Sequence, residues 1–140
     1  MQQPSSSSAT FRIGGDDLNP EEITELLSCE PTKIQTQGQI FRSKKSGKER
    51  TAKTGMWRLS VADSEPANLD SQIVEIFQKL PDDLNVWDEL ASRFDLDIFC
   101  GLFLNKTNDV ILIAPDPMQI LSSRGVTLTL DIYASAPLEG

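Results

Sequence analysis

The chain has 140 residues, of which 39% are hydrophobic and 24% are charged, and its formal net charge is −8. Such a length and composition are typical of one globular domain that is large enough to form a hydrophobic core. The sequence contains no histidine, which excludes Ser-His-Asp and Cys-His catalysis, the common zinc sites and histidine acid–base chemistry. The negative charge argues against general nucleic-acid binding, and no stretch is long and apolar enough to span a membrane.

The first eight residues, 1–8, are rich in Gln, Pro and Ser. They lack the charged start and the apolar centre of a signal peptide, so we expect a disordered tail and a cytoplasmic protein. The domain is expected to cover residues 9–136, with a short C-terminal tail at 137–140. Cys29 and Cys100 fit a reducing compartment as two free thiols; a disulfide is the alternative, and neither cysteine has Cys-x-x-Cys spacing.

The first predicted elements are a strand over residues 10–13, a two-glycine turn and a helix. Asn19 is a good N-cap, because its side-chain oxygen can accept a hydrogen bond from a free N–H of the first turn. Pro20 then occupies the first helical position, and Glu22 completes a capping box with Asn19. Pro31 predicts that the helix ends before it.

Asp16 and Asp17 follow the glycine turn and form a candidate site. Paired carboxylates in such a place can hold a metal ion or act as acid and base. The alternative is ordinary turn chemistry, in which Asp is common. The turn interpretation is favoured, since no third ligand follows at a recognisable spacing.

Two alternating stretches, residues 33–41 and 56–61, predict paired strands. The segment between them, 42–55, is basic, polar and without apolar runs, and is expected to be a mobile hairpin loop. Such a loop can clamp a phosphate or an acidic partner, or it can be a solubilising segment. Its candidate contact residues are Lys44, Lys45, Lys48 and Arg50.

Helical spacing predicts a helix over residues 69–80 and a shorter one after Asp82. On the second helix, one apolar side is predicted, formed by Leu84, Trp87, Ala91 and Phe94. A tryptophan on such a stripe favours a core anchor over a ligand-stacking residue. The following strand, 96–104, is apolar on both faces, which predicts a central position in the sheet.

The last predicted elements are an extended piece at 110–114, a helix and a strand. Asp116 begins a five-residue pattern similar to that at Asn19, which predicts Asp116 as an N-cap. The final strand, 126–133, carries a polar row that includes Asp131 and Tyr133. A carboxylate pair between Asp131 and Asp97 is one hypothesis, whereas a solvated sheet face is the favoured interpretation.

Several stretches together resemble a known family. They are Phe11 to Thr24 (FRIGGDDLNPEEIT), Glu30 to Lys33 (EPTK), Gly55 to Leu59 (GMWRL) and Leu128 to Tyr133 (LTLDIY). The combination resembles the bacterial domain-of-unknown-function family 4279. The resemblance implies a compact α+β domain and supplies no activity or catalytic residue.

The sequence therefore predicts an α+β fold, with an antiparallel or mixed sheet of about five strands and amphipathic helices packed on one face. The order of elements is compatible with a ferredoxin-like core that carries an extension.

We expect a non-enzymatic bacterial binding module of the immunity or regulator type, which masks a basic protein partner and needs no cofactor. One alternative is a carboxylate- or metal-dependent hydrolase that uses Asp16, Asp17, Asp97 or Asp131. Another is phosphate or nucleic-acid contact through the basic loop, which the lack of an aromatic residue in that loop disfavours. The oligomeric state is left open.

Overall fold

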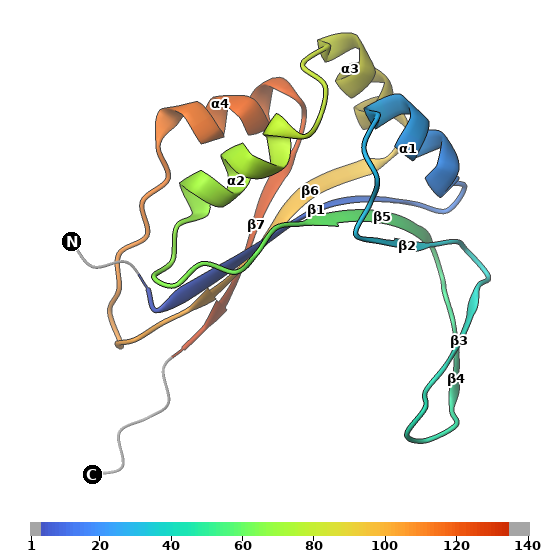
Figure 1. The fold of residues 1–140 in the computed structure, drawn as a ribbon, viewed down its shortest axis with the longest axis horizontal. Coiled ribbons are helices and arrows are strands. Elements are labelled where there is room, and N and C mark those ends of the chain that lie inside the picture. Colours follow the sequence, from blue (N-terminus) through green and yellow to red (C-terminus); the bar gives the residue numbers. More distant parts are fainter. Residues whose placement is uncertain (1–3, 135–140) are drawn as a thin grey trace.

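The computed structural model describes residues 4–134 and centres on a five-stranded mixed sheet in the order β2-β5-β1-β6-β7. The strands of this sheet are β1 (Ser6–Gly15), β2 (Lys33–Gln35), β5 (Gly55–Ser60), β6 (Asp95–Phe103) and β7 (Thr127–Tyr133). The helices among the described residues are α1 (Pro20–Leu27), α2 (Leu69–Gln78), α3 (Leu84–Arg93) and α4 (Pro115–Ser123). All of them lie on the same face of the sheet (Figure 1). The predicted α+β class is confirmed.

The strand directions and connections define the topology of the sheet. Strand β1 pairs antiparallel with β5 and β6, and β2 pairs antiparallel with β5. Together with α1 and α2, these strands have the β-α-β-β-α-β connectivity and strand order of a ferredoxin-like core. Helix α3 and the unit α4–β7 are the extension, with β7 parallel to β6. Strand β6 has neighbours on both sides, as its apolar faces predicted.

The predicted N-terminal tail is wrong from residue 6 onward, because β1 begins at Ser6. Ser7 is buried, and its Oγ donates a hydrogen bond of 2.6 Å to Oε1 of Gln72 on α2. The Nε2 of Gln72 in turn donates to the carbonyl of Ser7 at 3.0 Å. These long-range bonds hold a serine-rich strand that local composition cannot reveal. Residues 1–3 and the predicted tail at 137–140 lie outside the described residues.

The core lies between the sheet and the helices and is built around aromatic side chains. Trp57 and Trp87 are fully buried, Trp87 as predicted, and the Phe11 ring contacts both with centroid distances of 6.2 and 5.6 Å. Each indole N–H is satisfied: Trp57 donates to Oγ1 of Thr24 at 3.1 Å, and Trp87 donates to the carbonyl of Pro81 at 2.9 Å. Both tryptophans therefore act as core anchors.

Helix α1 begins at Pro20 as predicted, but its cap differs in detail. The Asn19 side chain accepts a hydrogen bond of 3.0 Å from the N–H of Glu21. The predicted capping box is wrong, because the Glu22 carboxylate instead accepts a 2.7 Å hydrogen bond from Nη2 of Arg93 on α3. An ion pair between two helices has replaced the local bond.

Helix α4 begins at Pro115, so the predicted N-cap at Asp116 is wrong. The cap position is Ala114, which has no side chain able to cap. Its backbone N–H instead donates to the carboxylate of Asp70 on α2, at 3.1 and 3.2 Å. The helix stops before Gly125, whose φ of 70° suits glycine. Within the described chain, the extended piece predicted just before α4 forms no strand.

The predicted buried side of α3 is wrong at two of its four positions. Trp87 and Phe94 are buried as predicted, whereas Leu84 is 48% exposed and Ala91 is exposed. Leu90 is fully buried instead. The stripe of Trp87, Leu90 and Phe94 is narrower than the predicted one, because α3 covers only the end of the sheet (Figure 1).

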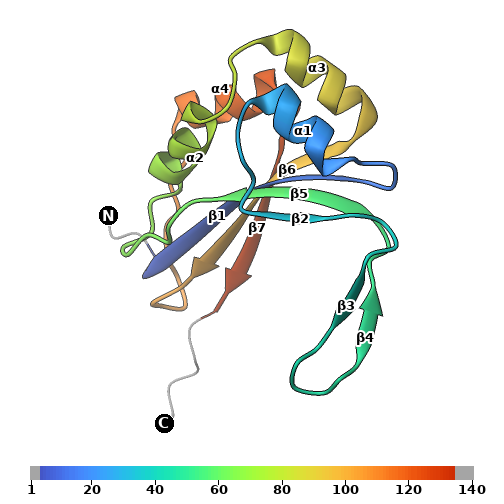
Figure 2. The ribbon, with the colours of Figure 1, turned by 45° about the vertical axis from the view of Figure 1, so that its right-hand side comes forward.

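The predicted strand 33–41 is split into two separate strands, and the predicted loop 42–55 contains a further one. Beyond β2 the chain folds into β3 (Ile40–Arg42) and β4 (Glu49–Thr51), an antiparallel pair that is separate from the main sheet. We call residues 36–54 the arm. It projects from the sheet on the side opposite the helices (Figure 2). Charged residues are tolerated in this ribbon because both of its faces meet solvent.

Candidate functional site

The sheet face opposite the helices, here called the open face, is uncovered in the described structure (Figures 1 and 2). Strand register places one polar row straight across its five strands. In sheet order the row consists of Lys33, Arg58, Arg12, Asp97 and Thr127. Three cations and one carboxylate therefore lie side by side on a surface whose other side covers the core.

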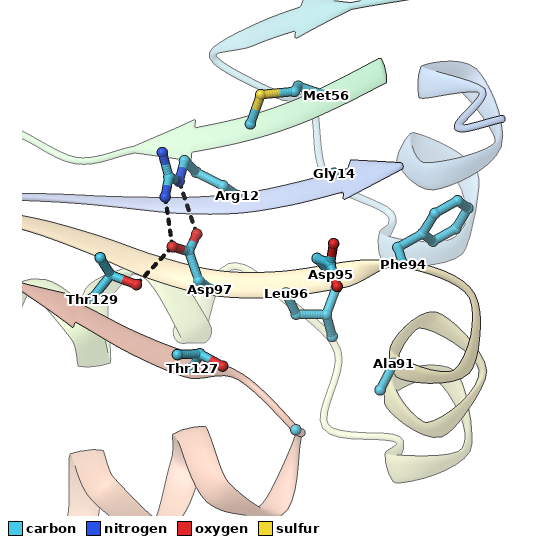
Figure 3. Close-up of a pocket in the computed structure, with 11 residues that line it drawn as sticks. Arg12, Gly14, Met56, Ala91, Phe94, Asp95, Leu96, Asp97, Thr127 and Thr129 are labelled. Atoms are coloured by element: carbon cyan, nitrogen blue, oxygen red, sulfur yellow. Dashed lines mark hydrogen bonds and ion pairs between the residues drawn. The ribbon is translucent and has the colours of Figure 1, made fainter. Parts of the chain in front are cut away.

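Arg12 and Asp97 form the best-defined pair on the open face. Nε and Nη2 of Arg12 donate to the two carboxylate oxygens of Asp97 at 2.8 and 2.6 Å, and Thr129 Oγ1 donates to Oδ2 at 2.9 Å (Figure 3). The hydrogen bond to Asp97 raises the pKa of Arg12 above its ordinary value. The Arg12 guanidinium also lies 4.3 Å from the centroid of the Phe99 ring. Both charged side chains are thus fixed in place before any ligand arrives.

An open cavity of about 550 Å³ adjoins this pair, at the end of the sheet where the chain passes from α3 to β6. Figure 3 shows the Asp95 carboxylate, the Met56 thioether and the Phe94 ring around it. The lining residues are Arg12, Gly14, Met56, Ala91, Phe94, Asp95, Leu96, Asp97, Gly125, Thr127 and Thr129. Because Asp97 is already bonded to Arg12 and Thr129, it is poorly placed to act as a general base here.

Arg58 contributes a cation that is not neutralised in the same way. Its Nη2 lies 3.2 Å from the sulfur of Met56, and its buried Nε has no hydrogen-bond partner within residues 4–134. Lys33 and Arg12 are its neighbours on either side of the row. The half of the open face next to the arm is therefore positively charged.

The opposite end of the open face carries an aromatic pair. The rings of Phe103 and Tyr133 stack with centroids 4.8 Å apart and an interplanar angle of 5°. They are 41% and 49% exposed, respectively. The Tyr133 hydroxyl donates a 2.7 Å hydrogen bond to Asp131, which raises the pKa of the phenol.

The carboxylates suggested for a hydrolase are not brought together. In the β6–β7 register, Asp97 lies opposite Thr127, and Asp131 lies opposite Gly101, so the two carboxylates are four residues apart, or roughly 13 Å along the strand. Asp16 and Asp17 are exposed in the turn after β1. Among residues 4–134, no group of three or more metal-ligating side chains converges.

The arm carries the candidate residues Lys44, Lys45, Lys48 and Arg50, all of them exposed. Arg42 on β3 pairs with Glu49 on β4, and the Arg50 guanidinium lies 4.6 Å from the centroid of the Phe41 ring. Residues 33–58 hold eight of the thirteen basic residues but only one of the twenty-one acidic residues. The arm and the adjoining strands are thus strongly basic, while the rest of the chain is strongly acidic.

A comparison with family models matches residues 5–135 to DUF4279, described as a domain of unknown function. The chain belongs to this family. The match covers nearly the whole chain of this DUF4279 protein, as the resemblance implied. A search of curated proteins and a search of solved structures found no significant match. None of the helices described for this DUF4279 member has the length and apolar character needed to cross a bilayer.

Several residues on the open face of this DUF4279 protein were not predicted as candidate site residues. Arg12 and Arg58 lie between buried residues of β1 and β5, and Phe99 and Phe103 belong to a strand that was predicted only to be apolar on both faces. Strand alternation could have placed each of them opposite the core. The arrangement into one row, however, depends on strand order, which the alternation does not contain.

Proposed function

We propose that this DUF4279 protein is a non-enzymatic binding module that holds a protein partner against the open face and the arm. The observation that carries the proposal is the one-sided covering of the sheet: helices fill one face, and the basic arm projects beside the other (Figure 2). The partner segment that contacts the arm is acidic, because residues 33–58 carry eight basic side chains against one acidic side chain.

The side chains of the open face support this role by their type. Arginine, methionine and aromatic residues are enriched in protein interfaces, where a few such anchors supply most of the binding energy. Arg12, held by Asp97 and stacked on Phe99, is one anchor, and the exposed pair of Phe103 and Tyr133 is a second. Anchors that are already ordered lose little conformational entropy on binding.

A second candidate surface favours a partner of the opposite charge, that is, a basic one. The solvent side of the helical layer is acidic, with exposed carboxylates at Glu21, Glu25, Asp88 and Glu89. This surface supports the expectation that the module masks a basic partner. In both versions the role is of the immunity or regulator type in a bacterial cytoplasm, a setting that the two free cysteines fit.

Capture experiments with paired charge reversals distinguish the two surfaces. Immobilised wild-type protein is compared with Lys45→Glu/Lys48→Glu on the arm and with Glu21→Lys/Glu25→Lys on α1, using extract of the native host at low salt. We expect one host protein to bind the wild type, to be released as salt rises, and to be lost with the arm variant.

The matched control is Lys79→Glu/Lys106→Glu, which makes the same change in net charge away from the arm. Equal capture by the arm variant and this control would contradict binding through the arm. Loss of capture with the α1 variant alone would support the acidic surface and a basic partner. If no host protein is captured by the wild type and lost with either the arm variant or the α1 variant, the binding-module proposal fails.

A further inference from the structure

The two edges of the main sheet differ sharply. Strand β2, at one edge, has only three residues, follows Pro31 and carries Lys33. Short length, proline and lysine are the devices that keep edge strands from pairing with other chains. Strand β7, at the other edge, has seven residues, Thr-Leu-Thr-Leu-Asp-Ile-Tyr, with none of these devices. We propose that β7 pairs antiparallel with β7 of a second copy, so that the protein forms a symmetric dimer.

The backbone of β7 has hydrogen-bonding groups ready for such a partner. Leu104 N–H donates to the carbonyl of Tyr133 at 3.0 Å, so the backbone groups of Tyr133 point toward β6. Because these groups alternate in direction along a strand, those of Leu128, Leu130 and Ile132 point outward. Within residues 4–134, no backbone bond beyond those of the main sheet involves these three residues. The outward groups form an open row of donors and acceptors.

One register between the two β7 strands uses all of these outward backbone groups. With the twofold axis at Leu130, this residue pairs with its own copy, and Leu128 pairs with Ile132 of the second copy on each side of the axis. Every pair exchanges two hydrogen bonds, about six in all. Leu130 and Ile132, which are 38% and 52% exposed in the single chain, then contact apolar side chains of the second copy.

The charge distribution favours a second copy over an unrelated charged partner at this edge. In a symmetric dimer the same surface meets its own copy, so a chain with a net charge of −8 forms such a contact most favourably through a surface of low charge. Strand β7 has a single carboxylate, Asp131, and the proposed register places it opposite Thr129 of the second copy, an uncharged residue, so the two carboxylates do not face each other. A strongly basic partner would find no acidic cluster along β7.

The dimer has a consequence for the open face. Antiparallel pairing at a sheet edge puts the twofold axis perpendicular to the sheet, which makes one continuous sheet. Both helical layers then lie on one side, and both open faces and both arms lie on the other. The assembly presents two copies of the candidate binding surface in the same direction, which suits a partner with repeated contact segments.

Sedimentation over a concentration series from about 1 to about 300 µM tests the dimer, because association follows mass action. We expect the wild type to approach twice the monomer mass at the upper end. Leu130→Lys and Leu130→Glu should each remain monomeric, since like charges would meet at the axis. An equimolar mixture of the two should dimerise again, because Lys and Glu then face each other.

The matched control is Ile34→Lys on β2, an apolar residue of similar exposure (45%) at the opposite edge, and it should dimerise like the wild type. A wild type that stays monomeric throughout the series overturns the proposal. So does a dimer that Leu130→Lys leaves intact, or one that Ile34→Lys disrupts as strongly as Leu130→Lys.

Amide hydrogen exchange of the unmodified protein gives a second test, which does not depend on the folding of any variant. Raising the concentration through the same series should slow exchange at Leu128, Leu130 and Ile132. The amide of Thr129, which points toward β6, should change much less. Exchange at the three outward amides that does not change with concentration overturns the proposal.

Discussion

Asp97 accepts hydrogen bonds from side chains of both neighbouring strands, Arg12 on β1 and Thr129 on β7. Its side chain is only 19% exposed and that of Arg12 is 29% exposed, so the pair is partly shielded from solvent. Removing one partner from such a pair is destabilising, because the remaining charge is partly shielded from solvent and has lost its partner. The same two residues therefore support the fold and shape the open face.

Replacing Asp97 should reveal this structural role. We expect Asp97→Ala to lower the free energy of unfolding by about 1.5–3 kcal/mol, because the Arg12 guanidinium is left without its acceptor. Asp131→Ala is the control, since within residues 4–134 the only side-chain bond of that carboxylate is the one it accepts from the exposed Tyr133. Urea unfolding followed by tryptophan fluorescence measures both, and equal effects would contradict this assignment.

The two cysteines should differ in reactivity. Cys100 is completely buried on the core side of β6, and burial, followed by the charge of Asp97, raises its pKa to about 12. Cys29 is half-buried, and burial raises its pKa by a smaller amount. Because the thiolate is the reactive form, iodoacetamide at pH 8 should label Cys29 first and Cys100 only on unfolding. Mass spectrometry of timed samples measures this order, and early labelling of Cys100 would contradict it.

At the scale of single elements, local sequence signals were reliable where the responsible interactions are local. Pro20 and Asn19 placed the start of α1 correctly, because the cap bond spans only two residues. The start of α4 was misplaced by the pattern at Asp116. The helix is preceded by Ala114, whose N–H bonds to Asp70, 44 residues away in the chain. A local capping pattern cannot reveal a helix start that is held by a distant side chain.

The cap of α1 can be tested directly. Asn19→Ala should lower the free energy of unfolding by roughly 0.5–2 kcal/mol through loss of its bond to the Glu21 N–H. Asp16→Ala, in the exposed turn, should cost less. Thermal melts of both variants with and without Mg²⁺, Mn²⁺ or Ca²⁺ measure the difference. A greater loss for Asp16→Ala, seen only with a cation, would support metal binding at the turn.

The arm should be the element most open to proteolysis. A two-stranded ribbon without a core of its own is marginally stable, and its turn at residues 43–48 carries three lysines. Trypsin at low concentration should therefore cut first at Lys44, Lys45 or Lys48. N-terminal sequencing of the first fragments identifies the cut. First cleavage at Lys79 or Arg124 would show that the arm is more firmly held than its shape indicates.

At the scale of the whole molecule, periodicity predicted the fold class but not the surface that we propose as the site. Alternation assigns each residue to one side of the sheet, because that side depends only on its own strand, but it does not predict burial. On the edge strand β7, Leu130 and Ile132 lie opposite buried residues of β6 and are still exposed. The row from Lys33 to Thr127 needs the order of five strands, which is set by the packing of all helices together. Residues 42–54 of the arm were predicted as a loop, because Arg42, Glu49 and Arg50 lack the apolar alternation on which strand prediction rests.

The architecture also predicts that the arm can be removed without loss of the fold. The β2–β5 register pairs Gln35 with Met56, which places residues 36 and 55 opposite each other. A two-residue Asn-Gly turn can therefore replace residues 37–54 and close an ordinary hairpin. The side-chain bond from Gln35 to the Thr54 carbonyl is lost, but no residue of the helix-covered core cluster is removed.

We expect the shortened chain to unfold cooperatively in urea, with a midpoint close to that of the full chain and a slightly smaller m-value, because less surface is exposed on unfolding. It should also keep the dimer, since β7 is at the opposite edge, and lose the acidic partner if that partner contacts the arm. Full-length Lys45→Glu/Lys48→Glu is the control, as it changes the charge of the arm and keeps its backbone. Broad, non-cooperative unfolding of the shortened chain would show that the arm helps to hold the sheet together, and the division into a folded body and a projecting binding arm would then be wrong.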